Sequence, residues 1–396
     1  MNTVFPKWIK VACCLSFLLT ACGGGTLKDP ADRYELAATE DKLSFTLEDN
    51  TTLLIKAMFL YTDPDGREYL TFQNDKEPQI FFYDIQTQRL AKKLELEREG
   101  SDGVGRTIGY YIKNMDEIFL TSAMTPEFYV VDGAGKLLRK MDVRKWTDFP
   151  LWPFPSISFR NTSVFFVGDK VYLYQDFNRQ LGFDDFLAKS PLTIMYDTLT
   201  HEVMVSDFKY PLIRTESDLA EGRTCSVEFS CCREYDGKRV IYSFGADEDL
   251  YVTNLENRLE RKVKAKSRYI DDVTRLNMRP ADIKAALRKM SEVPLYGNLL
   301  YDKYRDVYYR VAYPETEVDP SLDGGDLWQF GRSRFSIMIL DKDLRVIGET
   351  LFPDNIYIST LMFIREDGLY ISDSHFLNSD FSDDELRFHR FELRKK

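Results

Sequence analysis

Short stretches of alternating apolar and polar residues, separated by tight turns, fill most of the chain after residue 42. A hydrophobic period of two predicts β-strands rather than helices. One recurring unit is a short turn, often Asp-Gly, that runs into an apolar strand. Its six copies begin at Asp65, Asp116, Asp169, Asp236, Asp306 and Asp367. Turns of this kind between strands predict β-hairpins, because glycine adopts a positive φ at little cost.

A second unit, an apolar strand that ends in Asp or Asn before a tight turn, alternates with the first. Its copies are Phe82-Tyr83-Asp84, Val130-Val131-Asp132, Met195-Tyr196-Asp197, Val252-Thr253-Asn254, Ile339-Leu340-Asp341 and a degenerate sixth at Leu386 to Leu393. Six alternating copies of two units predict six repeats of four strands. We therefore expect an all-β fold, a six-bladed β-propeller over residues 42–396. The expected blades are 50–96, 105–143, 156–206, 222–264, 295–352 and 356–394 with 42–47.

The last repeat has only three strands of its own, so the N-terminal strand 42–47 is expected to pair with 386–393 and close the ring. Closure of this kind protects strand edges. One short helical insertion is predicted between blades four and five. Pro280 suits a first helical position, and Ala281 to Met290 carry Ile283, Leu287 and Met290 on one stripe, which we expect to pack on the propeller.

The first 21 residues have the pattern of a signal peptide. Lys7 and Lys10 precede an apolar stretch from Val11 to Ala21, whose eleven residues are too few to span a bilayer. Leu19-Thr20-Ala21-Cys22 matches a bacterial lipobox. We therefore predict cleavage before Cys22, acylation of that thiol and a tether over 22–41. The expected location is the cell envelope, as an outer-membrane lipoprotein on the periplasmic or the surface leaflet, bound to the membrane through its lipid.

Charge and cysteine content narrow the possible partners. Removal of residues 1–21 takes away two lysines and no acids, which leaves 51 basic against 64 acidic side chains, a net charge of −13. So acidic a chain lacks the basic footprint of a nucleic-acid-binding protein. Cys225, Cys231 and Cys232 remain after processing and are expected to be buried, reduced thiols. Neither CxxC nor HxxxH spacing occurs, so no metal and no cofactor are predicted.

The long connections of the predicted propeller all fall on one face, which is where binding usually resides. Arg106, Arg160 and Arg223 lie near the starts of innermost strands on that face and could form an anion site, or could pair with acids of neighbouring blades. Tyr110, close after Arg106, and Trp152, in a long connection, are further binding candidates. For Arg106 two roles remain open: a buried clamp between blades, which we favour, or a contact to an anionic ligand.

No catalytic residue is predicted. The chain lacks a Gly-x-Ser-x-Gly elbow, and none of His201, His375 and His389 has an evident catalytic partner in the sequence. The acids of Asp319 to Asp326 depart from EF-hand spacing and are better explained as a solvated turn. The preferred hypothesis is a non-catalytic module that binds a protein, small molecule or glycan through its loop-rich face. The alternative is a propeller hydrolase or lyase acting on glycans or other periplasmic substrates.

Several segments together resemble a known family. They are Gly66 to Leu70, Ile80 to Asp84, Glu99-Gly100-Ser101-Asp102-Gly103-Val104-Gly105-Arg106, Gly109-Tyr110 and Asp116 to Leu120. With the length and the lipobox, the chain resembles the Bacteroidota lipoproteins of domain of unknown function 4221. The resemblance implies a TolB-like six-bladed propeller at the cell envelope and implies no activity.

Overall fold

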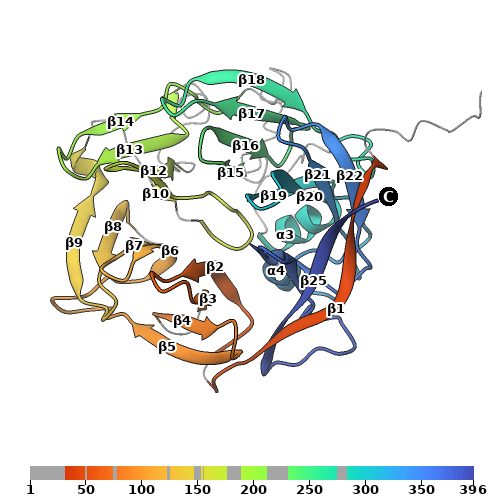
Figure 1. The fold of residues 1–396 in the computed structure, drawn as a ribbon, viewed down its shortest axis with the longest axis horizontal. Coiled ribbons are helices and arrows are strands. Elements are labelled where there is room, and N and C mark those ends of the chain that lie inside the picture. Colours follow the sequence, from red (N-terminus) through yellow and green to blue (C-terminus); the bar gives the residue numbers. More distant parts are fainter. Residues whose placement is uncertain are drawn as a thin grey trace, which may run out of the picture.

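The computed structural model describes residues 32–49, 51–74, 78–122, 125–146, 153–154, 156–175, 189–211, 231–273 and 283–396. Antiparallel sheets stand side by side around a common centre, an arrangement like that of a propeller (Figure 1). Helix is rare in the described part of the chain, which confirms the all-β class.

Four separate sheets contain the strands from β2 to β18. The first sheet contains β2 (Ile55–Thr62), β3 (Glu68–Asn74), β4 (Gln79–Asp84) and β5 (Arg89–Glu95). The second contains β6 (Thr107–Asn114), β7 (Glu117–Ser122), β8 (Glu127–Val131) and β9 (Leu137–Asp142). The third contains β10 (Pro153–Phe154), β11 (Phe165–Val167), β12 (Lys170–Gln175), β13 (Thr193–Asp197) and β14 (Val203–Val205). The fourth contains β15 (Cys231–Tyr235), β16 (Val240–Phe244), β17 (Asp249–Thr253) and β18 (Leu259–Lys264).

A fifth, eight-stranded sheet has the order β19-β20-β21-β22-β1-β25-β24-β23. One half contains β19 (Leu295–Asp302), β20 (Val307–Tyr313), β21 (Ser336–Leu340) and β22 (Val346–Leu351). The other contains β23 (Ile358–Arg365), β24 (Gly368–Ser372), β25 (Glu385–Lys395) and β1 (Tyr34–Thr46). Each half is antiparallel, and a parallel pair at Tyr34 and Gly348 joins them. Apart from β10, which lies before the expected third range of 156–206, the strands of each group fall in or close to one expected range.

Local side-chain chemistry explains the repeated turns. Asp-Gly turns such as Asp65-Gly66 connect the first strand of a sheet to the second, and Gly66 has φ +83°. The Asp or Asn that ends a third strand caps the next turn: Asp132 Oδ1 accepts hydrogen bonds from the amides of Ala134 and Lys136 at 2.9 and 3.0 Å. Asp341 does the same for Asp343 and Arg345. Asp and Asn recur at this position because their short side chains can accept hydrogen bonds from the backbone amides of the turn.

The N-terminal strand closes the last antiparallel group as predicted. Phe45 pairs with Leu386, and Lys42 pairs with His389. The strand is longer than the expected 42–47, because β1 begins at Tyr34 and continues past a register shift between Ala38 and Lys42. Part of the segment expected to be a tether is therefore strand. Figure 1 shows β1 and β25, the first and the last strand of the described chain, side by side along the rim.

The predicted insertion between the fourth group and the fifth is present as α3 (Ile283–Glu292). Met290 is buried, and Leu287 packs against the core formed by β20, β21 and β24, so these two residues of the stripe face the sheets as expected. A second helix, α4 (Gly324–Phe330), lies between β20 and β21 and was not predicted. Asp323 caps its first turn by accepting a hydrogen bond from the Gly325 amide at 2.7 Å. A 3-10 turn, η2 (Val143–Lys145), follows β9.

Candidate functional site

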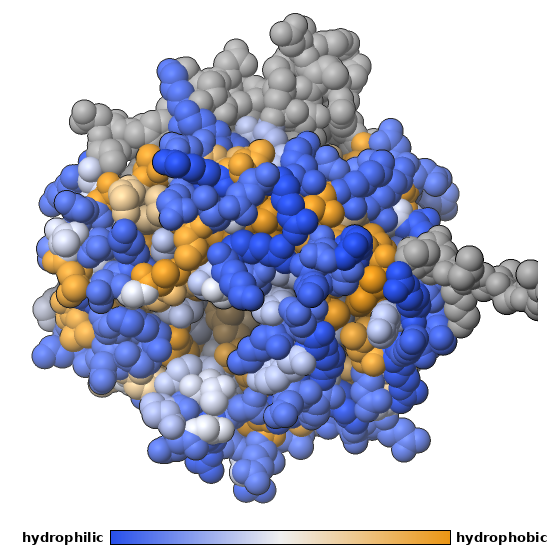
Figure 2. All heavy atoms as spheres, turned by 45° about the horizontal axis from the view of Figure 1, so that its top comes forward, coloured by the Kyte–Doolittle hydropathy of each residue, from blue (hydrophilic) through white to orange (hydrophobic). Residues whose placement is uncertain are grey.

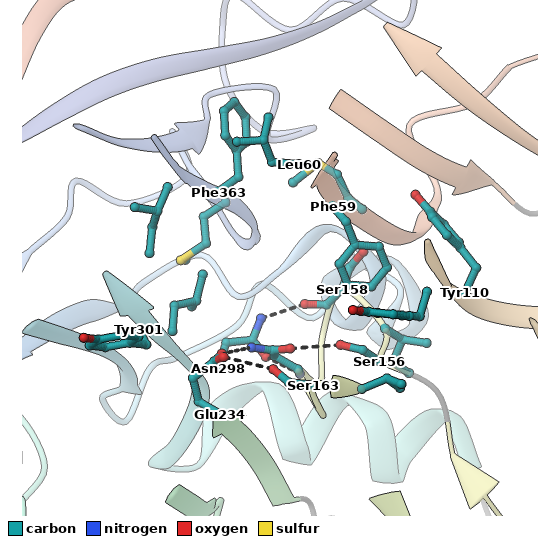
Figure 3. Close-up of a pocket in the computed structure, with 18 residues that line it drawn as sticks. Phe59, Leu60, Tyr110, Ser156, Ser158, Ser163, Glu234, Asn298, Tyr301 and Phe363 are labelled. Atoms are coloured by element: carbon teal, nitrogen blue, oxygen red, sulfur yellow. Dashed lines mark hydrogen bonds between the residues drawn. The ribbon is translucent and has the colours of Figure 1, made fainter. Parts of the chain in front are cut away.

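A cavity of about 350 Å³ occupies the centre of the ring. Residues of β2, β6, β15, β19 and β23 line it, together with the segment 156–164 that precedes β11 (Figure 3). Every sheet thus contributes its first strand, or the segment in that place, to one wall. The volume falls within the range of small-molecule sites, about 300–1,000 Å³. Figure 2 shows a hollow near the middle of one face of the molecule, with apolar residues in its depth.

The cavity lies toward the short turns and away from the long connections. Glu234, Tyr301 and Ile364 line it, and each stands one residue before the end of its strand. These first strands run from a long connection to a short turn, so their last residues are near the short-turn end of the ring. The loop-rich face, which the sequence favoured for binding, is therefore at the opposite end from this cavity.

The floor of the cavity is a turn at residues 156–161 that interrupts the inner strand of the third sheet. The pieces β10 and β11 pair with successive parts of β12, and the chain between them leaves the sheet for the centre of the ring (Figure 1). The Ser158 amide donates to the Lys56 carbonyl at 2.8 Å, and Asn298 Nδ2 donates to the Ser158 carbonyl at 2.7 Å. The turn is therefore held by the first sheet on one side and by β19 on the other.

A second, smaller cavity of about 50 Å³ lies against the same turn. Phe159 lines it, with Arg332, Tyr313 and residues of α3 and α4. Ser158 lines the large cavity and Phe159 the small one, so the tip of the turn separates the two. A volume of this size accommodates a water molecule or a small ion but no organic ligand.

Glu234, on β15, is the carboxylate that lines the large cavity. Its Oε2 accepts a hydrogen bond from Asn161 Nδ2 at 2.8 Å, and its Oε1 accepts from Ser163 Oγ at 3.1 Å and from the Tyr235 amide at 3.2 Å. Burial raises the pKa of Glu234 to about 7, although these three donors and the charge of Arg233 oppose the shift. A carboxyl group that changes its charge near neutral pH inside a cavity is a candidate functional group.

The remaining polar residues extend the network around Glu234. Asn161 donates a second hydrogen bond, to the Leu299 carbonyl at 3.0 Å, and its backbone amide donates to Asn298 Oδ1 at 3.1 Å. Ser156 Oγ donates to Asn161 Oδ1 at 2.9 Å. Across the cavity the lining is apolar, with Met58, Leu60, Met362, Phe363 and Ile364 from β2 and β23. The cavity is therefore amphipathic, with one polar wall and one apolar wall.

Comparison with known proteins identifies the family. The family model "Domain of unknown function (DUF4221)" matches residues 33–351. The chain belongs to the DUF4221 family. The crystal structure of a DUF4221 member from Bacteroides vulgatus ATCC 8482 is similar, with a TM-score of 0.81 and 26% identity, covering 92% of this chain and 100% of that one.

A more distant likeness concerns the fold alone. The crystal structure of a protein described as exported, from Bacteroides fragilis NCTC 9343, has a TM-score of 0.53 and 10% identity, covering 91% of this chain and 96% of that one. No curated protein matches the sequence.

The predicted binding residues of the DUF4221 chain do not come together around the cavity. Tyr110 forms part of its wall, but its hydroxyl donates to Thr71 Oγ1 at 2.8 Å in the core between the first two sheets. Arg106 is exposed directly before β6, which does not fit a buried clamp. Arg160 is half-buried in the 156–161 turn. Arg223, Trp152 and the lipidation residue Cys22 lie outside the described residues, so their predicted roles stay predictions.

Other arginines of the DUF4221 chain are the ones buried between sheets. The Arg310 guanidinium donates to the carbonyls of Asp247, Glu248 and Ala265 at 2.6–2.9 Å and lies over the Tyr296 ring. Arg233 donates to Thr193 Oγ1 at 2.7 Å and to the Ser163 carbonyl at 2.6 Å. These contacts join neighbouring sheets, so both arginines stabilise the packing of one sheet against the next. The sequence carried no signal that separated these arginines from exposed ones.

The two described thiols and His375 are buried, whereas His389 is half-buried and His201 is exposed. Cys231 and Cys232 are buried and reduced, as predicted, whereas Cys225 lies outside the described residues. Burial lowers the pKa of His375 to about 4, and its Nδ1 accepts a hydrogen bond from the Leu377 amide at 3.2 Å. His389 Nδ1 and the Tyr357 hydroxyl lie 2.9 Å apart, at the seam with β1.

The acidic run at 319–326 belongs to a turn and a helix cap, since Asp319 Oδ1 accepts from the Ser321 amide at 2.8 Å and Asp323 caps α4. Within the described ranges, no three His, Cys, Asp or Glu side chains gather as a metal site. No described helix is long and apolar enough to cross a membrane.

Sequence reasoning missed Glu234, Asn161, Asn298 and Ser163, which form the polar wall. Their positions are far apart along the chain, and Glu234 is one of 64 acidic residues. One local signal was present: the segment Ser156 to Ser163 breaks the apolar alternation where the third repeat should have its first strand. That break marks the turn that enters the ring.

Proposed function

We propose that this protein is a six-bladed propeller, anchored in the cell envelope, that binds a small ligand in its central cavity. Two features support six blades. A parallel pair at a single position, Tyr34 with Gly348, joins the two antiparallel halves of the eight-stranded sheet, so each half resembles a blade of its own. The cavity walls also come from six places in the chain, one for each antiparallel group.

The observation that carries the binding proposal is the polar wall around Glu234. Its carboxylate is held by three donors from two separate chain segments and faces an apolar wall across a volume suited to a small molecule. A buried ionisable group is costly unless a partner compensates it. A concave, largely apolar site with a few convergent polar groups is the usual form of a ligand pocket.

The described lining of the cavity does not contain the pair of residues that the hydrolase alternative needs. Glycosidase chemistry uses two carboxyl groups about 5–10 Å apart, whereas the described lining of the cavity supplies Glu234 as its one carboxylate. The other ionisable lining residues are Tyr110, Tyr111 and Tyr301, and burial raises the pKa of each. We therefore favour binding over catalysis.

The envelope location rests on the lipobox at Leu19 to Cys22 and agrees with the description of the distant Bacteroides fragilis relative as exported. Replacement of Cys22 by Ser should leave the protein unprocessed or move it to the soluble periplasmic fraction. Cys14→Ser, which changes a thiol outside the lipobox, is the matched control. Recovery of Cys22→Ser as a processed, membrane-bound protein would contradict the anchor.

Ligand binding is tested by filling the cavity. Leu300 lines it and is half-buried, so Leu300→Trp should occupy part of its volume. The control is Leu138→Trp, the same change at a residue that is 46% exposed on β9. A panel of monosaccharides, amino acids, short fatty acids and aliphatic amines, each at millimolar concentration, is screened by thermal denaturation and calorimetry. At least one compound should bind the wild type and the control and bind Leu300→Trp at least about tenfold more weakly. Equal binding by all three proteins, or no binding at all, would refute the proposal.

A further inference from the structure

We propose that the ligand of the central cavity is an organic monocation, an ammonium group on an apolar body, with the ammonium at Glu234. The inference rests on the proposed function and names the chemical class of its ligand. Three observations lead to it: the missing counter-charge of Glu234, the donors already committed around it, and the apolar wall opposite.

Glu234 is half-buried and has no cationic partner among the described residues, whereas the most deeply buried carboxylates each have one. Asp302 pairs with Arg305 at 2.7 Å, Asp84 with Arg67 at 2.9 Å and Asp236 with Arg239 at 2.8 Å. Asp373 pairs with Lys42 and Glu349 with Arg268. None of the described lysines or arginines forms an ion pair with Glu234. A ligand cation would supply the charge that the protein provides at each of the other sites.

The nearest arginine along the chain does not fill this role. Arg233 precedes Glu234 on β15, so the two side chains point to opposite faces of the strand. Its guanidinium donates to Thr193 Oγ1, the Ser163 carbonyl and the Tyr172 carbonyl, and lies 5.5 Å from the centre of the Phe165 ring. Arg233 is therefore occupied by the third sheet and by the core between the sheets.

The hydrogen bonds of the polar wall leave Glu234 able to accept one more hydrogen bond from a donor in the cavity. Asn161 Nδ2 uses its two hydrogens on Glu234 and the Leu299 carbonyl. Ser163 Oγ donates to Glu234, and Ser156 Oγ donates to Asn161 Oδ1. With these donors committed, the carboxylate retains acceptor capacity toward the cavity, because an ionised carboxylate has about four lone-pair sites and three are used. An ammonium group donates without accepting, which fits this wall.

A metal cation fits less well. Calcium takes about six to eight oxygen ligands, commonly several carboxylates. Among the described residues that line the cavity one is a carboxylate, and Asn161 Oδ1 and Asn298 Oδ1 already accept hydrogen bonds. A bare ion would also leave the wall of Met58, Met362 and Phe363 without a contact. An organic body fills that space and removes apolar surface from water.

The charge of Glu234 sets how binding should vary with pH. Its pKa, raised by burial to about 7, means that the carboxylate is ionised above neutral pH and protonated below it. The ionisable groups that share the cavity are Tyr110, Tyr111 and Tyr301, which stay neutral because burial raises the pKa of each. Cys232, on the same face of β15, stays a neutral thiol because burial raises its pKa to about 11. An aliphatic ammonium, with a pKa of about 10, remains charged throughout.

The test uses two matched pairs of probes: cyclohexylamine with cyclohexanol, and 2-phenylethylamine with 2-phenylethanol. Calorimetry on the wild type, on Glu234→Gln and on Glu260→Gln, an exposed control on β18, measures each affinity. At about pH 8.5 an amine should bind the wild type and the control at least about tenfold more tightly than its alcohol. Glu234→Gln should lose that preference. At about pH 5.5 the wild-type affinity for the amine should fall by about thirtyfold, because the carboxyl is then protonated.

The possible outcomes distinguish the proposal of a cationic ligand from the proposal that the cavity binds a ligand at all. Equal affinity for amine and alcohol, or an amine preference that Glu234→Gln keeps, overturns the cationic ligand. If a compound of another class binds the wild type and is lost in Leu300→Trp, the cavity is a binding site but its ligand is not a cation. If neither these probes nor any panel compound binds, both proposals fail.

Discussion

The third sheet and the closing strands of the last group differ in how regularly their strands pair. β1 and β25 have thirteen and eleven residues and pair at ten positions, so they form a long seam with one register shift, between Ala38 and Lys42. In the third sheet, β10 has two residues, and β11 and β14 have three each. The regular seam holds the ring together, whereas the interrupted sheet sends residues 156–161 into the centre. Asn161 and Ser163 of the polar wall come from the place where the repeat is broken, because the chain that leaves the third sheet there reaches the centre beside Glu234 of β15.

The largest effect should come from removal of the seam. A chain that starts at residue 47 lacks β1 and exposes the edge of β25, together with the partners of the buried residues Leu36 and Phe45. We expect a loss of more than about 5 kcal/mol in the free energy of unfolding, measured by chemical denaturation. The control is a chain that starts at residue 32 and retains β1. If the two chains unfold at the same denaturant concentration, the seam does not stabilise the ring.

The next effect concerns the turn in the third sheet. Asn161→Ala removes hydrogen bonds to Glu234, to the Leu299 carbonyl and from Ser156, and leaves Glu234 with two donors. We expect a loss of about 2–4 kcal/mol of stability, and weaker ligand binding as well. Asn114→Ala, in the regular hairpin between β6 and β7, is the control, with an expected loss of about 1 kcal/mol. Similar losses for both would mean that the turn is no more constrained than a surface hairpin.

A third prediction uses the pH dependence of stability. Because the pKa of Glu234 is raised from 4.5 to about 7 in the folded protein, the folded state binds the proton more tightly than the unfolded state. The contribution of this group to stability is therefore full below about pH 4.5 and is lost as the pH rises through 7. Glu234→Gln should be more stable than the wild type by up to about 3 kcal/mol near pH 8, with most of that gain gone near pH 5. A constant difference across this range would show that burial does not shift the pKa.

The smallest effect is expected at Arg106. Its side chain is exposed, so Arg106→Ala should change the free energy of unfolding by less than about 0.5 kcal/mol. Arg233→Ala, which removes a buried guanidinium with three hydrogen-bond partners, should cost several times more. Thermal denaturation of both variants checks the contrast. A large loss at Arg106 would restore the buried-clamp hypothesis from the sequence.

Much of the fold could be predicted because its signals are local. The strand period, the Asp-Gly turns and the Asp and Asn caps act over two to six residues, so Asp65-Gly66 and Asp132 could be interpreted without their surroundings. The pairing of 42–47 with 386–393 followed from a count of strands. Helix α4 was missed because its seven residues carry little periodicity, and its cap, Asp323, lies in a run that reads as an acidic turn.

The candidate site could not be predicted in the same way. The strand pattern places Arg106, Arg160 and Arg223 near strand starts, but it does not show which residues pack over each position and so does not predict their exposure. Arg106 is exposed, whereas Arg310, which shows no distinguishing signal in the sequence, is buried beneath neighbouring carbonyls.

The sequence by itself determined the class of the fold, the boundaries of most hairpins, the closing strand and the lipobox, because each depends on residues close in the chain or on a simple count of repeats. The tertiary structure alone decided which face carries the cavity and which side chains form its polar wall. Asn161, Glu234 and Asn298 are separated by 73 and 64 positions along the chain. Only ring closure brings them into hydrogen-bonding distance. The raised pKa of Glu234 likewise arises from burial by residues of several sheets, so no local pattern could have revealed it.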